Sequence, residues 1–175
     1  MSFTNGRISG ITRLQIKDAA GFSFPEFDDQ IQAMAFRKES ATQCVVSNVG
    51  FVNINDPLDS ELTTEKTLLA NYRAFSLRID RRVVPPSTLK IRIMEETKKI
   101  LQETGQQCLY REQREDLRAR VELELLSKVP PVTEIYDIAI DTLTGIVYVA
   151  SVTAKVVDTF LDAFKEAFGI RLHTL

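Results

Sequence analysis

The sequence predicts an α+β protein with a mainly antiparallel sheet, helices packed on that sheet, and a protruding helical hairpin. Short segments of alternating apolar and polar residues predict strands. Residues 87–128 instead show a long, strongly charged helical pattern, and residues 154–168 predict an amphipathic helix. A chain of 175 residues with 44% hydrophobic content can bury one sizeable core, so we expect a single domain over residues 1–175 with the hairpin as a subdomain.

The first third of the chain predicts a strand, a helix and a second strand. Residues 11–16 have the apolar spacing of a first strand. Residues 24–36 carry Pro25 near their start, acidic residues in the first turns and apolar residues at helical spacing, which predicts a short amphipathic helix. Residues 45–54 are apolar and β-branched, but Gly50 interrupts them, so we expect a bend there and an exposed loop afterwards.

The middle of the chain changes from strands to helices at a double proline. Residues 67–72 and 74–84 predict two strand segments, either as a hairpin or as one longer bulged strand. After the prolines, Ser87 or Thr88 can cap a helix that ends at Gly105.

A second helix is predicted over residues 111–128. It places Leu117, Val121 and Leu125 against many charged residues, and it ends before another double proline. Residues 87–128 therefore indicate a helical hairpin. Its outer half has little to bury in a core, and we expect it to project from the sheet.

The last third predicts a β-hairpin, a helix and a final strand. Residues 135–140 and 146–150 are strands joined by a turn in which Gly145 supplies the permissive backbone position. Residues 154–168 then form the amphipathic helix, which a glycine closes, and a last strand lies over residues 170–174.

Composition limits the classes of function. The net charge of −2 and the pI near 5.5 argue against a generally basic protein, so nucleic-acid binding requires a local patch or assembly of subunits. Cys44 and Cys108 lack metal-ligand spacing, and the N-terminus lacks the apolar core of a signal peptide, so we expect a reduced, cytosolic protein. Apolar runs are too short to cross a bilayer, and we expect neither membrane attachment nor a cofactor.

The segment from Leu77 to Leu89 joins an alternating basic strand to the first double proline. A strand here sets Arg78 and Arg82 on one face, spaced for contact with a backbone of regular negative charge, and Arg81 lies between them. The other interpretation is a solvated strand edge that charge protects from aggregation.

Other cations are weaker candidates for DNA contact. Arg37 and Lys38 follow the first helix, where they can equally complement the helix dipole, and Arg73 and Lys90 are further candidates. Acidic residues interleave at helix-pair spacing with the cations of the second hairpin helix, which predicts a neutral, salt-bridged face. These cations are Arg111, Arg114, Arg118 and Arg120.

An enzyme needs a constellation of catalytic residues, and none is evident. His173, the only histidine, lies in the predicted last strand without a cysteine or carboxylate neighbour. A metal-dependent nuclease needs two or three converging carboxylates. Asp137 and Asp141 lie on predicted strands, but turn and capping roles account for Asp141. We expect no catalytic residue and no metal site, and a nuclease is the less favoured alternative.

Short motifs occur along the chain in a fixed order. They are Phe24-Pro25-Glu26, Met34-Ala35-Phe36-Arg37, Gly50-Phe51-Val52, Leu77-Arg78 with Asp80 and Arg82 before Val83-Val84-Pro85, Glu124-Leu125-Leu126, Thr153-Ala154-Lys155 and Ala167-Phe168-Gly169. In this order and spacing, over roughly residues 24–175, they resemble the bacterial RdgC family of recombination-associated proteins.

The resemblance implies a ring-shaped homodimer that encircles duplex DNA through a positively charged hole and restrains RecA-driven recombination. Family members are longer, so the chain resembles their N-terminal half as a short form. Two motifs depart from the family pattern: Phe51-Val52-Asn53 stands for Trp-Val-Pro, and Ser127-Lys128-Val129-Pro130 stands for Pro-Arg-Ala-Phe. A half-length chain can form a ring by higher oligomerisation or bind DNA as an open clamp.

These observations predict a non-catalytic, nucleoid-associated protein of bacterial or phage origin. We expect it to bind double-stranded or single-stranded DNA without sequence preference, as a homo-oligomer, and to modulate recombination by occupying the DNA. The alternative is a protein-interaction module that has lost DNA binding, which the acidic pI favours.

Overall fold

The computed structural model describes residues 10–16, 26–38 and 46–175. These residues divide into two compact units. The sheet unit contains residues 10–16, 26–38, 48–80 and 133–175, and the hairpin unit contains residues 46–47 and 81–132. Pro25 and Cys44, which the sequence analysis considers, lie outside the described residues.

One seven-stranded sheet has the order β2-β4-β5-β6-β1-β7, with β3 paired to β4. The pairs β1–β6, β1–β7, β3–β4 and β5–β6 are antiparallel. The predicted α+β class is therefore confirmed. The strands are β1 Thr12–Ile16, β2 Ser47–Val52, β3 Leu68–Leu69, β4 Tyr72–Arg81, β5 Val132–Asp141, β6 Ile146–Val149 and β7 Leu172–Thr174.

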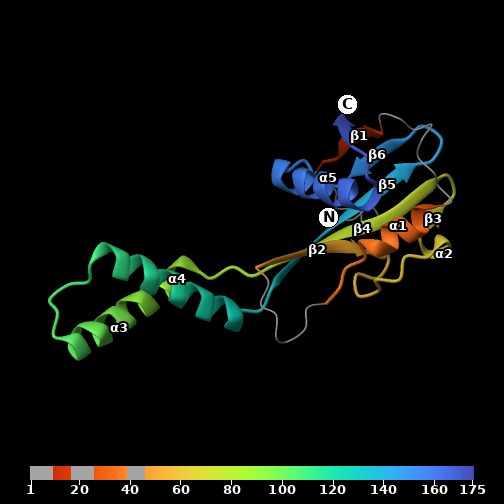
Figure 1. Ribbon diagram of the computed structural model, residues 1–175. Coiled ribbons are helices and arrows are strands. Elements are labelled where there is room, and N and C mark those ends of the chain that lie inside the picture. The colour runs from red at the N-terminus through yellow and green to blue at the C-terminus, as the bar shows by residue number, and fades with distance from the viewer. Residues whose placement is uncertain (1–9, 17–25, 39–45) are drawn as a thin grey trace. The chain divides into compact units, whose positions relative to one another are not determined.

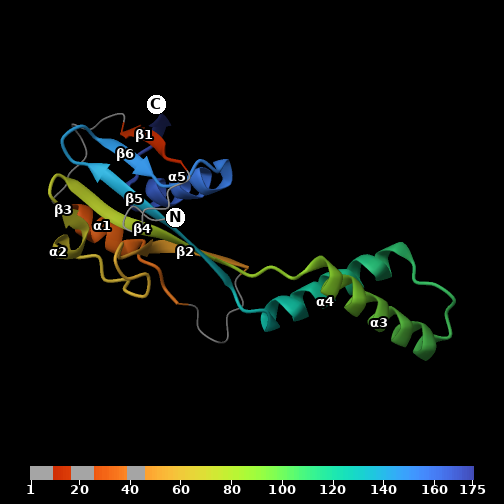
Figure 2. The ribbon, with the colours of Figure 1, turned by 180° about the vertical axis from the view of Figure 1, so that it is seen from behind.

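Helices α1 (Phe27–Ala33) and α5 (Ala154–Phe168) lie side by side on one face of the sheet (Figure 1). Phe27 stacks on Phe168 with ring centroids 5.2 Å apart, and both helices pack on the buried side chains of β1, β2, β4, β5 and β6. Burying these aromatic rings removes a large apolar area from water, which holds the helices on the sheet. Figure 2 shows the same unit from behind.

The segment before β4 differs from the prediction. Residues 67–72 were expected as a strand, but Thr64–Thr67 form the short helix α2 and only Leu68–Leu69 form a strand. Of the two arrangements that the sequence left open, the hairpin is confirmed, because β3 pairs antiparallel with the start of β4. Ala70 in the turn has a φ of 52°, a left-handed conformation unusual for a residue with a Cβ.

Gly50 is part of a continuous strand, so the predicted bend is wrong. A Cβ at Gly50 would lie 2.4 Å from the Cα of Phe36, and the glycine is needed because the chain around Phe36 runs directly against β2. Phe36 donates its amide to Phe51, and Ala35 forms a parallel bridge with Phe51. Helix α1 accordingly ends earlier than predicted, at Ala33, because the next residues pair with β2.

The hairpin unit contains helices α3 (Pro86–Thr104) and α4 (Arg111–Lys128). The predicted Ser87 or Thr88 cap is wrong: α3 starts at Pro86, where a missing N–H costs nothing. Gly105 does end α3, with a φ of 69°. Among the described residues, no helix has the length and apolar character needed to cross a membrane. The small core of this unit contains Leu109, Leu117 and Val121, with Leu89, Ile93, Ile100, Leu101 and Leu125 packed against it.

Candidate nucleic-acid interface

Arg78 on β4 is held by three partners inside the sheet unit. Its Nε and Nη2 donate to the two carboxylate oxygens of Asp80 at 2.9 and 2.8 Å. Its Nη1 donates to the carbonyl oxygen of Pro57 at 3.2 Å, and its guanidinium carbon lies 4.2 Å from the centroid of the Phe36 ring. The side chain is only 17% exposed. Arg78 therefore joins β4 to the loop after β2 and to the chain after α1.

The contacts of Arg78 also affect the pKa of Asp80. Burial raises the pKa of Asp80, but hydrogen bonds from Arg78 and Thr133, together with the Arg78 charge, outweigh burial and lower it. Asp80 is thus ionised at neutral pH and neutralises Arg78. A paired, mostly buried arginine presents little free positive charge to a phosphate backbone.

Arg73 is an interior residue. Its Nη1 donates to Asp28 at 3.1 Å and to the hydroxyl of Thr67 at 3.0 Å, and its guanidinium lies 5.0 Å from the centroid of Phe27. The residue is 7% exposed. These contacts join β4 to α1 and α2, so Arg73 does not belong to a surface that could meet DNA.

Arg37 and Lys38 are exposed at the end of the segment that pairs with β2. The Arg37 carbonyl accepts a hydrogen bond from the Asn48 amide at 2.8 Å, which holds the backbone. Neither side chain forms an ion pair within the part of the chain that the structure describes. They are the accessible cations among the predicted contacts of the sheet unit.

In the hairpin unit, Arg82 connects the end of β4 to the end of α4. Its Nη1 donates to the carbonyl oxygen of Val129 at 2.6 Å, and its backbone amide donates to Val46 at 3.0 Å. Arg81 beside it is half-buried, while Lys90 on α3 is exposed. Sequence neighbours on the basic strand thus have different environments.

Several charged residues of the hairpin form ion pairs with one another. Arg92 lies 2.9 Å from Glu95, 3.6 Å from Glu96 and 3.7 Å from Glu124. A hydrogen bond with Glu95 raises the pKa of Arg92, and hydrogen bonds from lysines lower the pKa values of Glu96 and Glu124. Of the four arginines for which the sequence predicted a neutral, salt-bridged face, Arg111 has such a pair, whereas Arg114, Arg118 and Arg120 form none with a described residue. Further pairs are Lys99–Glu96, Arg111–Glu115 and Lys128–Glu124.

Five cations of α3 and α4 differ from this pattern, since Arg114 and Arg120 also form no ion pair with a described residue, and the other three line one surface. Lys90, Lys98 and Arg118 form no ion pair with any residue that the structure describes. They line two depressions of about 270 and 550 Å³ that share Ile93 and Met94. We name this surface the hairpin groove, defined by Lys90, Ile93, Met94, Lys98, Leu101 and Arg118.

Lys98 was not among the residues predicted to contact DNA, and Arg118 was predicted to lie on the neutral face. Lys90, Met94 and Lys98 are spaced four residues apart, which places them along one side of a helix. That signal was present in the sequence. The position of Arg118 beside Lys90 depends on how α4 packs on α3, which no local pattern contains.

The two carboxylates considered for nuclease chemistry serve structural roles. Asp137 is 1% exposed and accepts a hydrogen bond from the hydroxyl of Ser76 at 2.8 Å. Asp141 caps the turn before β6 by accepting from the amide of Leu143 at 2.9 Å. Hydrogen bonds from Thr144 and Leu143 lower the pKa of Asp141. Within the described residues, no group of three His, Cys, Asp or Glu side chains could hold a metal ion.

A comparison with protein families gives a match over nearly the whole chain. A model of the family described as "RdgC: Putative exonuclease, RdgC" matches residues 10–173, which is nearly the whole chain. No curated protein matches the chain.

Proposed function

Because the chain belongs to the RdgC family, we propose that it binds duplex DNA without sequence preference and modulates recombination by occupying that DNA. Membership supports a recombination-related role in DNA binding in general. The absence of sequence preference is our own inference from the kind of contact available. Lysine and arginine bind phosphates, which are the same at every base pair.

The hairpin groove is the observation that carries this proposal. Lys90, Lys98 and Arg118 line this groove and form no ion pair with a described residue, whereas Arg92, Lys99, Arg111 and Lys128 on the same helices do. A cation without an ion pair can contact a phosphate, and so release a counterion from the DNA, without first giving up a salt bridge in the protein. Local charge of this kind allows binding by a protein whose net charge is −2.

Of the cations predicted from the sequence, Arg37 and Lys38 on the sheet unit and Lys90 on the hairpin unit remain candidates for phosphate contact because they are exposed. Arg78 and Arg82 have a structural role in this proposal, because Arg78 donates a hydrogen bond to Asp80 and Arg82 donates one to the carbonyl oxygen of Val129. We leave Arg73 out of the interface because it is buried against Asp28.

We propose a non-catalytic role, although the family description contains the word exonuclease. The buried position of Asp137 and the turn role of Asp141 support this view. Degradation of DNA by the purified protein in the presence of Mg²⁺, lost in Asp141→Asn, would contradict it.

We also propose that the protein forms a homo-oligomer through the hairpin unit. Ile91, Leu123 and Tyr110 are 57%, 64% and 70% exposed, and α3 has no fully buried residue. Apolar side chains at such exposure commonly mark contacts with another chain. Sedimentation equilibrium at several concentrations measures the state, and a monomer at high concentration would contradict an oligomer.

Binding to a fluorescent duplex, measured by anisotropy at two salt concentrations, tests the DNA proposal. The variant Lys90→Glu/Lys98→Glu/Arg118→Glu should lose most of its affinity. Its dependence on salt should also fall by about 0.9 in the slope for each phosphate contact removed. Duplexes of unrelated sequence should bind equally well.

The matched control is Lys99→Glu/Arg111→Glu/Lys128→Glu, which makes the same change in net charge at cations that already have ion pairs. We expect a much smaller loss of affinity in this control. Equal losses in the two variants would show that net charge alone matters. If the natural chain does not bind at low salt, the protein-interaction alternative replaces the proposal.

A further inference from the structure

A pocket of about 480 Å³ lies in the sheet unit on the face opposite α1 and α5. Ala74 of β4 and Ala139 of β5 form its floor, and Leu69 of β3 forms a wall. Strand alternation separates this floor from the core, because Phe75 and Ile138, the next residues, face the helices. We name it the tyrosine pocket after Tyr72 and Tyr148.

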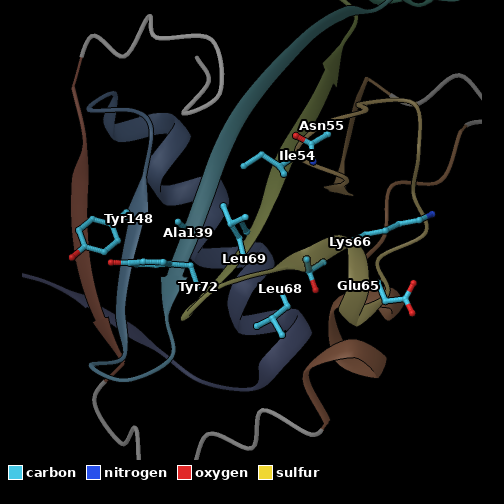
Figure 3. Close-up of a pocket in the computed structure, with 11 residues that line it drawn as sticks. Ile54, Asn55, Glu65, Lys66, Leu68, Leu69, Tyr72, Ala139 and Tyr148 are labelled. Carbon is cyan, nitrogen blue, oxygen red and sulfur yellow. The ribbon is translucent and has the colours of Figure 1, made fainter.

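Figure 3 shows that the two ends of the pocket differ. Tyr72 and Tyr148 lie at one end, and Glu65 and Lys66 lie at the other, with Ala139 and Leu69 between them. A ligand that fills the pocket therefore meets aromatic and aliphatic surface at one end, and the charged groups of Glu65 and Lys66 point outward at the other end.

The apolar end is built from side chains that remain accessible. Leu69 is 68% exposed and Tyr72 is 39% exposed. The two alanines leave room above the sheet that a larger residue would fill. A volume of about 480 Å³ with mainly apolar walls and a few polar groups is typical of sites that bind a ligand.

The charged end carries an excess of carboxylates. The Lys66 ammonium donates to Asp59 and Glu61, both at 2.8 Å, so its charge is already neutralised. Glu65 is exposed and forms no ion pair with the described residues. Two carboxylates contact the Lys66 ammonium, and Glu65 adds a third carboxylate without an ion pair to a described residue, so the net charge at this end is negative. Such an end favours a cation and disfavours a phosphate.

We propose that the tyrosine pocket binds a short segment of a partner protein that carries an aromatic or aliphatic side chain beside a basic residue. The apolar side chain occupies the end with Tyr72 and Tyr148. The basic residue lies against Glu65 and the carboxylates around Lys66. This site does not depend on DNA binding, because its charge is opposite to that of the hairpin groove.

Two capped hexapeptides test the proposal as probes. Each carries a central Phe-Leu pair, followed by two arginines in one peptide and two glutamates in the other. Titration into the ¹⁵N-labelled full chain should shift amides of residues 68–72, 139 and 148. The arginine peptide should bind at least about tenfold more tightly than the glutamate peptide at low salt.

Three variants assign the effect to the pocket. Ala139→Phe fills the floor and should abolish binding, and Leu69→Ser, at an exposed position, should weaken it even if Ala139→Phe does not fold. Glu65→Gln should reduce the preference for the arginine peptide. The matched control Asp162→Asn removes an exposed carboxylate from α5. The preference for the arginine peptide should stay unchanged in this control.

Several results would overturn the proposal. Equal binding of the two peptides would remove the argument from charge, and failure of both to bind would remove the site. Displacement of the arginine peptide by a single-stranded oligonucleotide would identify the occupant as nucleic acid. Self-association that Leu69→Ser abolishes would identify it as a second copy of the chain.

Discussion

Individual basic residues of this protein have roles that depend on their neighbours more than on their charge. Arg78 is bonded to Asp80 and Pro57 and stacks on Phe36, whereas Lys90 is exposed and has no ion pair among the described residues. Replacing Arg78 would therefore disturb the fold, and loss of DNA binding in such a variant would not identify a phosphate contact. The exposed cations are the informative ones to change.

Gly50→Ala tests the close approach of two chain segments. The new Cβ would lie 2.4 and 2.7 Å from backbone atoms of Phe36, so one segment must move. We expect a loss of about 2–3 kcal/mol in the free energy of unfolding, measured by chemical denaturation.

The matched control is Gly169→Ala in the same unit. Gly169 has a φ of 69°, but no atom lies within 4 Å of an added Cβ. Only backbone strain remains, and we expect a loss of about 1 kcal/mol. Equal losses at the two glycines would contradict a steric role for Gly50.

The ionisation of Asp59 makes the free energy of unfolding depend on pH in the acid range. Hydrogen bonds from Lys66, Glu61 and Asn53 lower the pKa of Asp59 from 3.8 to about 2, against the opposing effect of burial. Because the folded pKa lies below the unfolded value, this contribution is present above about pH 4 and is lost as the pH falls towards 2.

Denaturation of the natural chain and Asp59→Asn at several pH values measures this effect. The difference between them should be on the order of 1 kcal/mol at pH 7 and should shrink as the pH falls below 4. Asp162→Asn, which changes an exposed carboxylate, should follow the natural chain. A difference that stays constant with pH would contradict the assignment.

At the scale of elements, the hairpin helices depend on a few side chains. Leu117 and Val121 are the only residues of α4 that are fully buried, and α3 contributes only partly buried ones. Helices with so small a core depend strongly on each buried residue, because propensity alone does not keep isolated helices of this length stable in water.

Leu117→Ala should therefore destabilise the hairpin by about 2–3 kcal/mol. Leu117 is 3% exposed and packs in the hairpin core, which is separate from the core of the sheet unit. Hydrogen exchange should become faster for amides of residues 86–128, while amides of β5 and β6 should change little.

The matched control is Leu123→Ala in the same helix, since Leu123 is 64% exposed. Its effect should stay below about 0.5 kcal/mol. Equally fast exchange throughout the sheet in Leu117→Ala would show that the two cores unfold together, against this prediction.

At the scale of the whole molecule, opposite charges occur on different units. The hairpin groove carries cations that form no ion pair with a described residue, and carboxylates outnumber ammonium groups at the charged end of the tyrosine pocket once Asp59 and Glu61, the partners of Lys66, are included. The net charge of −2 for the whole chain does not indicate that the two sites differ in the sign of their charge. DNA binding by such a protein is expected to weaken steeply with salt, while the apolar part of peptide binding should persist.

Periodicity in the sequence was sufficient to predict the class of fold and most of its elements. The sheet strands β4, β5 and β6 and the helices α3, α4 and α5 all lie where the patterns predict them. Glycines at the ends of α3 and α5 adopt the expected left-handed conformation. These features depend on contacts within a few residues, and local sequence contains them.

Contacts between distant segments explain what the sequence did not reveal. Gly50 was predicted to bend the chain because its close neighbour Phe36 is remote in sequence. The short helix α2 was missed because four residues show no helical period.

The sequence by itself determined the α+β class, the helical hairpin and the family to which the chain belongs. Only the tertiary structure decided which cations are paired: Arg78 with Asp80, Arg73 with Asp28, and Lys90 with no described residue. It also brought α2, β3, β4, β5 and β6 together around the tyrosine pocket. The physical reason is that periodicity specifies which side of an element is buried, whereas charge pairing and cavities arise only when separate elements meet.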